Sequence, residues 1–265
     1  MGQTGFVNVN SIDVYYEVSG EGKPLVLLHG FPLDSRMWEP QMDALSKKFQ
    51  VIRFDMRGLG KTIDPGLPFT FYEDLHALLI KLDIQSANFI GVSFGGYAGV
   101  EFALAYPDMV QSLILVCSGG FAPISEDRQL LMKKFYEELS SGNIERALEI
   151  NLHLFLDGPK QDIGRVQINR EWLKEIFRDI YSKPMNQSKP KWLDPHPSER
   201  LSEVQVPTLV VSGELDHLDF IKTADLLVTN IPNAKHLTFK NSAHFPNIDS
   251  PDEFNEIVTS FINNN

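Results

Sequence analysis

A single serine, Ser93, stands inside the glycine-rich sequence Gly91-Val92-Ser93-Phe94-Gly95. An apolar run precedes it and a small-residue helical pattern follows it, which predicts a sharp turn from a strand into a helix. Glycines permit such a turn because they lack a Cβ and tolerate unusual backbone angles. The hydroxyl would then lie at a helix N-terminus, where the helix dipole favours developing negative charge. This context predicts a nucleophilic serine rather than one that only caps a helix.

A serine hydroxyl becomes an effective nucleophile when a base accepts its proton and a carboxylate orients that base. Asp216 follows a predicted apolar strand and is the candidate acid, with Asp219 and Glu214 as competitors. His244 is the candidate base, because it lies between the last predicted strand and the last predicted helix. That loop belongs to the carboxyl end of the sheet, where Ser93 is also expected. The other histidines are interpreted as surface or core residues.

Acyl transfer also requires backbone N–H groups directed at the oxygen on which negative charge develops. Phe94 follows the serine directly and is one predicted donor. Phe31 is the other, from the loop His29-Gly30-Phe31-Pro32 that follows an apolar run. We expect His29 to brace this loop by hydrogen bonds and to take no part in proton transfer.

Strand and helix patterns alternate around these residues. Residues 6–10 and 12–18 alternate in polarity and predict an antiparallel hairpin at the start of the sheet. Continuous apolar runs follow, as in strands that are buried on both faces of a parallel sheet. They lie at residues 24–30, 49–55, 87–93, 112–118 and 208–214. With helical patterns between them, they predict an α/β fold with a mostly parallel sheet and helices on both faces.

Residues 123–200 interrupt this alternation, because three amphipathic helical patterns follow one another without a strand. We predict a helical lid, inserted after the sixth strand, over the strand ends. Residues 1–122 and 201–265 would form the core domain. Four aromatic residues are candidates for binding substrate beneath the lid: Trp38, Phe121, Phe155 and Trp192.

The formal net charge of −11 argues against nucleic acids and anionic membranes as partners and leaves a small-molecule substrate. No apolar run approaches the roughly 20 residues of a membrane span, and the N-terminus lacks a leader pattern, so we expect a cytoplasmic protein. Gly60-Lys61-Thr62 resembles the end of a phosphate-binding loop, but Asp55 occupies the position of its first glycine. The lone Cys117 and the histidine spacing do not suggest a metal site, so we expect neither cofactor nor metal.

Taken together, segments spread over nearly the whole chain resemble the serine-dependent α/β-hydrolases, in the order found in that family. They are HGFP at 29–32, DMRGLGKT at 55–62, GVSFGG at 91–96, VVSGELD at 210–216 and SAHFPNIDSP at 242–251. The resemblance implies an α/β-hydrolase fold, with Ser93 as nucleophile, Asp216 as acid and His244 as base. Ala243 departs from the glycine that often precedes the family's catalytic histidine.

Within this family the chain most resembles small esterases, enol-lactonases of the 3-oxoadipate type and carbon–carbon bond hydrolases. The resemblance implies hydrolysis of a small carboxylic ester or lactone through an acyl-enzyme. Carbon–carbon bond hydrolysis, perhydrolysis and thioester hydrolysis are alternatives with the same three residues. A ligand receptor on a hydrolase fold is the alternative without catalysis. Epoxide hydrolases and haloalkane dehalogenases carry an aspartate where this chain has Ser93, which argues against both of those chemistries.

Overall fold

The structure is a computed structural model that describes residues 2–183 and 189–265. Its strands are β1 (Gln3–Val9), β2 (Ile12–Ser19), β3 (Pro24–Leu28), β4 (Gln50–Phe54), β5 (Ala87–Val92), β6 (Val110–Val116), β7 (Thr208–Gly213) and β8 (Ala234–Phe239). Its α-helices are α1 (Glu39–Leu45), α2 (Phe71–Lys81), α3 (Phe94–Ala105), α4 (Glu126–Ser140), α5 (Ile144–Leu152), α6 (Arg170–Tyr181), α7 (Leu218–Asn230), α8 (Pro246–Asp249) and α9 (Pro251–Asn263). No helix in the described part of the chain is long and apolar enough to cross a lipid bilayer.

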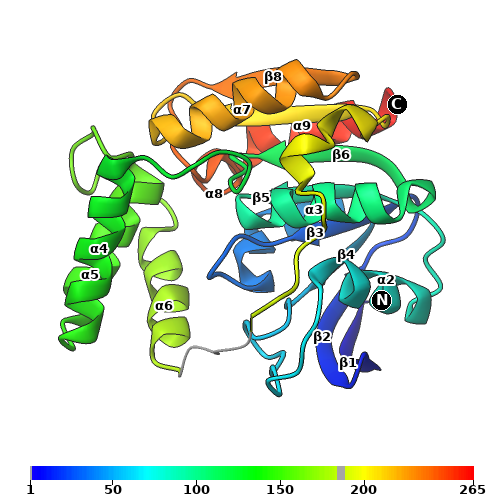
Figure 1. Cartoon of the computed structure of the whole chain (residues 1–265), viewed down its shortest axis with the longest axis horizontal. Coiled ribbons are helices and arrows are strands. Elements are labelled where there is room, and N and C mark those ends of the chain that lie inside the picture. The colour runs from blue at the N-terminus through cyan, green and yellow to red at the C-terminus, as the bar shows by residue number, and fades with distance from the viewer. Residues whose placement is uncertain (1, 184–188) are drawn as a thin grey trace.

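All eight strands form one sheet in the order β1-β2-β4-β3-β5-β6-β7-β8 (Figure 1). β2 pairs antiparallel with β1 and with β4. Every pairing from β4 to β8 is parallel. This confirms the predicted mostly parallel sheet opened by an antiparallel hairpin. Parallel strands end at the same edge, so the loops that follow β3, β5, β7 and β8 lie at one edge of the sheet, where α/β proteins bind ligands.

Helices cover both faces of the sheet, as predicted. Val26 of β3 packs in the core cluster that contains side chains of α2, α3 and α7, whereas its neighbour Leu27 packs in the cluster that contains side chains of α1 and α9. Phe89 and Ile90 of β5 divide between the same two clusters. Because successive strand residues point to opposite faces and both faces are covered, these strands read as continuous apolar runs.

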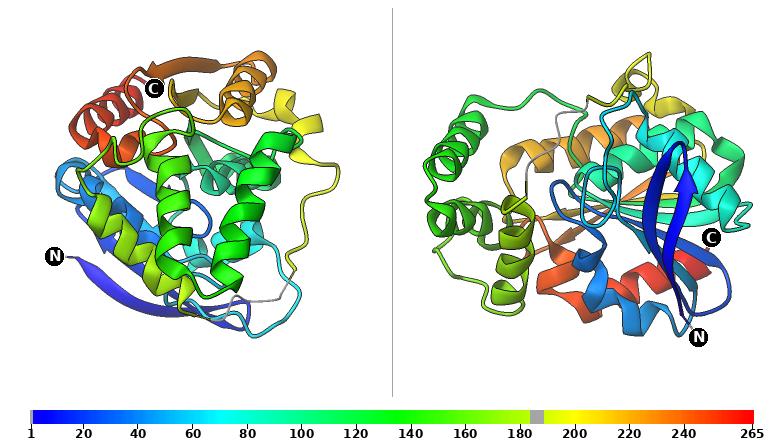
Figure 2. Two further views of the ribbon diagram at one scale, coloured as in Figure 1. Left: turned by 90° about the vertical axis from the view of Figure 1, so that its left-hand side faces the viewer. Right: turned by 90° about the horizontal axis from the view of Figure 1, so that it is seen from below.

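Helices α4, α5 and α6 lie between β6 and β7 in the chain, with no strand among the described residues of that segment. Figure 1 shows them beyond one end of the sheet, and the left view of Figure 2 shows them in front of the core. A π-helical turn, His153–Asp157, continues α5, and its Phe155 carbonyl accepts a hydrogen bond from the His244 N–H at 2.9 Å. The limits of the predicted lid, residues 123 and 200, stay a prediction.

Buried ionic contacts hold this helical segment together. The carboxylate of Asp157 is fully buried and pairs with Arg170 of α6 at 2.9 Å. The same carboxylate accepts hydrogen bonds from the N–H groups of Gly164 and Val166. Arg165 donates to the Asn241 carbonyl at 2.9 Å, in the loop that leads to His244. The helical segment therefore contacts the loop after β8 at two points, through Phe155 and through Arg165.

The first turn of α3 lies directly against the backbone of the sheet. A Cβ on Gly95 would collide with the carbonyl group of Leu28 in β3, and a Cβ on Gly91 would collide with the carbonyl of Gly95. Backbone atoms within a sheet cannot swing aside as side-chain tips can. The glycines around Ser93 are therefore required by the close approach of β3, β5 and α3.

Replacing Gly95 by alanine should lower the free energy of unfolding by about 2 kcal/mol or more, because the new methyl group meets backbone. Gly99 lies one turn later on α3, and a Cβ there would meet only side-chain methyl groups, at 3.3 Å and 3.8 Å. Gly99→Ala is the matched control and should change stability by less than about 1 kcal/mol. Urea unfolding of both variants measures the difference, and equal losses would contradict the close-approach account.

Candidate active site

Ser93 joins β5 to α3 in a strained conformation, with φ of 54° and ψ of −113°. Such a positive φ is uncommon for a residue other than glycine and persists only where surrounding contacts enforce it. Here the Ser93 N–H donates to the Val116 carbonyl at 2.8 Å, and its carbonyl accepts from the N–H groups of Gly96 and Tyr97. The turn places the side chain at the N-terminus of a 12-residue helix, on the wall of a cavity.

Asp216 and His244 form a buried pair at the same edge of the sheet. Asp216 follows β7, His244 follows β8, and 2.7 Å separates Asp216 Oδ2 from His244 Nδ1. Each side chain is 1% exposed. The other carboxylate oxygen accepts the His217 N–H at 2.7 Å. The acid is thus fixed by two hydrogen bonds, and its contact with Nδ1 leaves Nε2 as the nitrogen that can accept a proton.

The two loops that carry this pair are in close backbone contact. A Cβ on Gly213, the last residue of β7, would collide with the Ala243 carbonyl, directly before His244. Of the rival carboxylates, Glu214 is exposed and Asp219 accepts hydrogen bonds from the N–H and the hydroxyl of Ser125, both at 3.0 Å. Among these three carboxylates, Asp216 is the one that contacts the imidazole.

The imidazole lies behind the cavity wall that Ser93 also helps to form. The rings of Phe220 and Phe155 both line this cavity, and their centroids lie 4.0 Å and 4.9 Å from that of His244. His244 Nε2 is buried and has no hydrogen-bond partner among the described residues, so no hydrogen bond joins it to the Ser93 hydroxyl. Catalytic hydrogen bonds are often long or poorly aligned before substrate binds. A proton transfer would need these two groups to form that hydrogen bond.

The loop that follows β3 packs against the serine. A Cβ on Gly30 would lie 3.5 Å from Ser93 Cβ, and the rings of Phe31 and Phe94 make an edge contact at 6.5 Å. Phe31 directly follows Gly30, which packs against Ser93. Phe94 directly follows Ser93 in the chain. Both residues line the cavity, and the role of their N–H groups as oxyanion donors stays a prediction.

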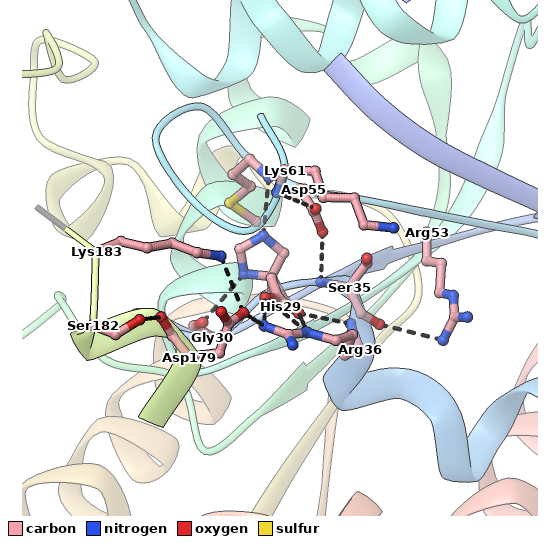
Figure 3. A network of polar contacts seen from close by, with 12 residues as sticks. His29, Gly30, Ser35, Arg36, Arg53, Asp55, Lys61, Asp179, Ser182 and Lys183 are labelled. Atoms are coloured by element: carbon pink, nitrogen blue, oxygen red, sulfur yellow. Dashed lines mark hydrogen bonds and ion pairs between the residues drawn. The ribbon is translucent and has the colours of Figure 1, made fainter. Parts of the chain in front are cut away.

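His29 is buried beneath this loop and is held by backbone groups, as Figure 3 shows. Its Nε2 accepts the Met56 N–H at 3.0 Å, and its Nδ1 lies 3.2 Å from the Gly30 carbonyl. Burial lowers the pKa of His29, which favours the neutral imidazole that these contacts require. This histidine joins two loops, as the sequence predicted, and does not face the cavity.

Residues 55–62, which follow β4, form hydrogen bonds with the segment that follows β3. The Asp55 carboxylate accepts the N–H groups of Ser35 at 2.9 Å and Lys61 at 2.8 Å. Arg36, in the short helix Ser35–Trp38 after β3, forms an ion pair with Asp179 of α6 at 2.7 Å (Figure 3). These contacts hold the segment after β3 against the segment after β4. The ion pair also links the segment after β3 to α6.

A cavity of about 690 Å³ lies between the strand ends and helices α4 to α6. One wall is an aromatic cluster in which the rings of Phe71 and Trp192 contact that of Phe94, at 5.0 Å and 6.1 Å. Phe155, Phe220 and residues of the helical segment also line the cavity. Its surface is therefore suited to a partly apolar small molecule.

Two of the four aromatic residues predicted to bind substrate line this cavity, namely Phe155 and Trp192. The prediction was wrong for Trp38, because the short helix Ser35–Trp38 turns its fully buried ring into the core beside α1 and α9. It was also wrong for Phe121, which is buried behind the wall and packs against Tyr97 at 5.3 Å.

Several cavity residues were missed by sequence reasoning. Tyr97 lies one helical turn after Ser93 and could have been predicted from that spacing. Phe220 and Arg128 reach the cavity from α7 and α4, and no local pattern indicates where those helices pack.

One group of potential metal ligands occurs in the described part of the chain, formed by Cys117, Asp216 and His244, whose ligand atoms lie within 4.8 Å of one another. Burial raises the pKa of the Cys117 thiol, whereas metal binding requires the thiolate. Nδ1 of the histidine is already engaged by Asp216. The group is therefore better suited to holding the imidazole than to holding an ion.

Comparison with known proteins supports these observations. The family model described as the alpha/beta hydrolase fold matches residues 23–251. A pimeloyl-[acyl-carrier protein] methyl ester esterase of Aliivibrio fischeri (strain MJ11) is 26% identical over 94% of this chain and 97% of that protein.

Two solved structures are similar over almost the whole chain. Est816, described as an N-acyl homoserine lactone degrading enzyme, has a TM-score of 0.77 and 25% identity, over 97% of this chain and 100% of that one. A bromoperoxidase from Bacillus anthracis has a TM-score of 0.79 and 26% identity, over 98% and 100% of the two chains. The esterase and the lactone-degrading enzyme support a hydrolase activity.

Exchanging Asp216 for asparagine should lower kcat for ester hydrolysis by about 10⁴-fold, because an amide can favour the wrong imidazole tautomer. Glu214→Gln is the control, since it removes a carboxylate two residues away that is exposed. Steady-state hydrolysis of a p-nitrophenyl ester measures both variants. Equal activity in the two variants would remove Asp216 from the site.

A buried carboxyl behind the cavity should make stability depend on pH. Glu101 of α3 is fully buried and accepts the Leu193 N–H at 2.8 Å, and burial raises its pKa to about 7 from 4.5. Between these values the folded chain binds more protons than the unfolded chain, so stability should fall as the pH rises through that range. Glu101→Gln should abolish this decrease, which amounts to up to about 3 kcal/mol in the free energy of unfolding of the unmodified protein. Parallel stability curves for the two proteins between pH 4.5 and pH 7.5 would contradict this.

Proposed function

The chain belongs to the α/β-hydrolase family, and from this premise we propose that it is a cofactor-free serine hydrolase that cleaves a small carboxylic ester or lactone. The observation that carries the proposal is the buried Asp216–His244 pair, whose imidazole has an unpartnered Nε2. The imidazole of this pair lies against Phe155 and Phe220, two rings of the cavity wall that Ser93 also helps to form. A base with a fixed tautomer beside a serine is the arrangement that acyl transfer needs.

In the proposed reaction, substrate binding brings the Ser93 hydroxyl and His244 Nε2 into contact. His244 accepts the hydroxyl proton while Ser93 Oγ attacks the carbonyl carbon, and Asp216 stabilises the imidazolium that forms. The N–H groups of Phe31 and Phe94 hold the oxyanion. His244 then protonates the leaving alcohol. Water, deprotonated by the same imidazole, releases the acid from Ser93.

The cavity and the relatives support the proposed substrate class. A volume of about 690 Å³ with mostly apolar walls favours a small or medium-sized molecule with an apolar part. The relatives support ester and lactone substrates, because one is named as a methyl ester esterase and another as a lactone-degrading enzyme.

Perhydrolysis is the second candidate, favoured by the similarity to the Bacillus anthracis bromoperoxidase. Hydrogen peroxide would replace water in the second step, attack the acyl-enzyme and release a peracid. Measuring acid and peracid formed from one ester, with and without hydrogen peroxide, separates the two. We expect the acid to be the main product under both conditions. A peracid yield that exceeds the acid yield at millimolar peroxide would favour perhydrolysis.

Ser93→Ala should abolish turnover of p-nitrophenyl esters and labelling by a fluorophosphonate, with an unchanged circular dichroism spectrum. Ser86→Ala is the control, because this serine precedes β5 at the opposite end of the strand that leads to Ser93. Retained esterase activity in Ser93→Ala would refute the nucleophile. Fast labelling of the unmodified protein with negligible turnover would favour a ligand receptor.

A further inference from the structure

Arg128 of α4 brings a positive charge close to the catalytic imidazole. Its side chain lines the cavity and is only 15% exposed. The guanidinium carbon lies 4.0 Å from the centroid of the Phe220 ring, and that ring lies 4.0 Å from the ring of His244. One aromatic ring therefore separates the guanidinium from the imidazole. A small substrate in the cavity could therefore contact Arg128 with one group while another group lies near His244.

The hydrogen-bonding capacity of this guanidinium is unused in the described part of the chain. Its Nε is buried without a partner. The nearest carboxylate is that of Asp219, 3.8 Å from the Arg128 Nη1 atom. The same Asp219 oxygen already accepts two hydrogen bonds from Ser125. Burial lowers the pKa of Arg128, which Asp219 and Asp216 only partly oppose. An arginine desolvated without a close acceptor is a candidate for binding an anion.

The other cations of the cavity wall are already paired. Arg57 donates to both carboxylate oxygens of Asp74, at 2.7 Å and 2.9 Å, and its side chain is 1% exposed. Lys183 is half exposed and lies 3.0 Å from Asp179. Among the described cationic residues that line the cavity, Arg128 thus has the most distant carboxylate partner.

We propose that Arg128 binds a carboxylate of the substrate, so that the preferred substrates are esters or lactones that carry a free carboxylate. This inference rests on the proposed function and refines its substrate class. A carboxylate matches the planar guanidinium and can accept two parallel hydrogen bonds from it. The aromatic wall around Phe94 would hold the apolar part of the same molecule. Asp219, 3.8 Å from Arg128 Nη1, balances the charge of the guanidinium without occupying its donors.

A structural role would leave a different signature. The contact of Arg128 with Phe220 is a cation–π interaction that could hold the wall behind His244. Loss of such a brace would impair neutral and anionic substrates alike. A carboxylate-binding role predicts a loss that depends on substrate charge.

The test compares p-nitrophenyl hydrogen glutarate with p-nitrophenyl pentanoate, which have acyl chains of equal length with and without a terminal carboxylate. Arg128→Gln should lower kcat/KM for the glutarate ester by about 10- to 100-fold and leave that for the pentanoate ester within about threefold. Arg128→Lys should restore part of the preference. Lys183→Gln is the matched control, because it removes a paired cation of the same cavity, and it should leave the preference unchanged.

A binding measurement separates failure of this inference from failure of the proposed function. Calorimetry with glutarate, and with pentanamide as the neutral comparison, requires no turnover. Glutarate should bind the unmodified protein more tightly than Arg128→Gln by about 10-fold or more, and pentanamide should bind both alike. Equal loss on both esters, or equal glutarate affinity in both proteins, would overturn the role of Arg128. Absence of ester turnover would overturn the proposed function and leave the calorimetric result as the test.

Discussion

The proposed chemistry depends on one buried hydrogen bond, 2.7 Å long, between the Asp216 carboxylate and His244 Nδ1. Both side chains are almost completely removed from solvent, so each depends on the other and on nearby backbone for its polar partners. The His217 N–H satisfies the second carboxylate oxygen. This arrangement fixes the ring and leaves Nε2 as its basic atom, without which the Ser93 hydroxyl would have no proton acceptor.

Close backbone packing makes this bond possible. Gly213 lets the loop that carries Asp216 lie against the loop that carries His244, and Gly95 lets α3 lie against β3. At each position a methyl group would meet a carbonyl oxygen, so neither approach could occur with another residue. The helical segment adds a further constraint, because the Phe155 carbonyl accepts the His244 N–H. The cavity wall and the loop that carries His244 are thus joined by a backbone hydrogen bond.

The sequence predicted features that are determined locally or by strand order. The glycines around Ser93 indicated the sharp turn, and the continuous apolar runs indicated strands covered on both faces. The position of Asp216 after one strand and of His244 after the next was enough to bring them to the same edge. Features that depend on how helices pack were not predictable. Trp38 is adjacent in sequence to a cavity loop, yet a short helical turn directs it into the core. Arg128 lies in a charged helix, and the sequence of that helix does not show that Arg128 lines the cavity together with Met132, Phe135 and Tyr136.

The central claim is that His244 Nε2 accepts the proton of the Ser93 hydroxyl, although the two side chains are not hydrogen-bonded in this structure. A crystal structure of the protein inactivated by a small fluorophosphonate tests this most directly. The account predicts phosphorus bonded to Ser93 Oγ, His244 Nε2 within hydrogen-bond distance of that oxygen, and the phosphoryl oxygen facing the N–H groups of Phe31 and Phe94. Phosphorus on another residue, or an imidazole that stays out of reach of the modified serine, would contradict it.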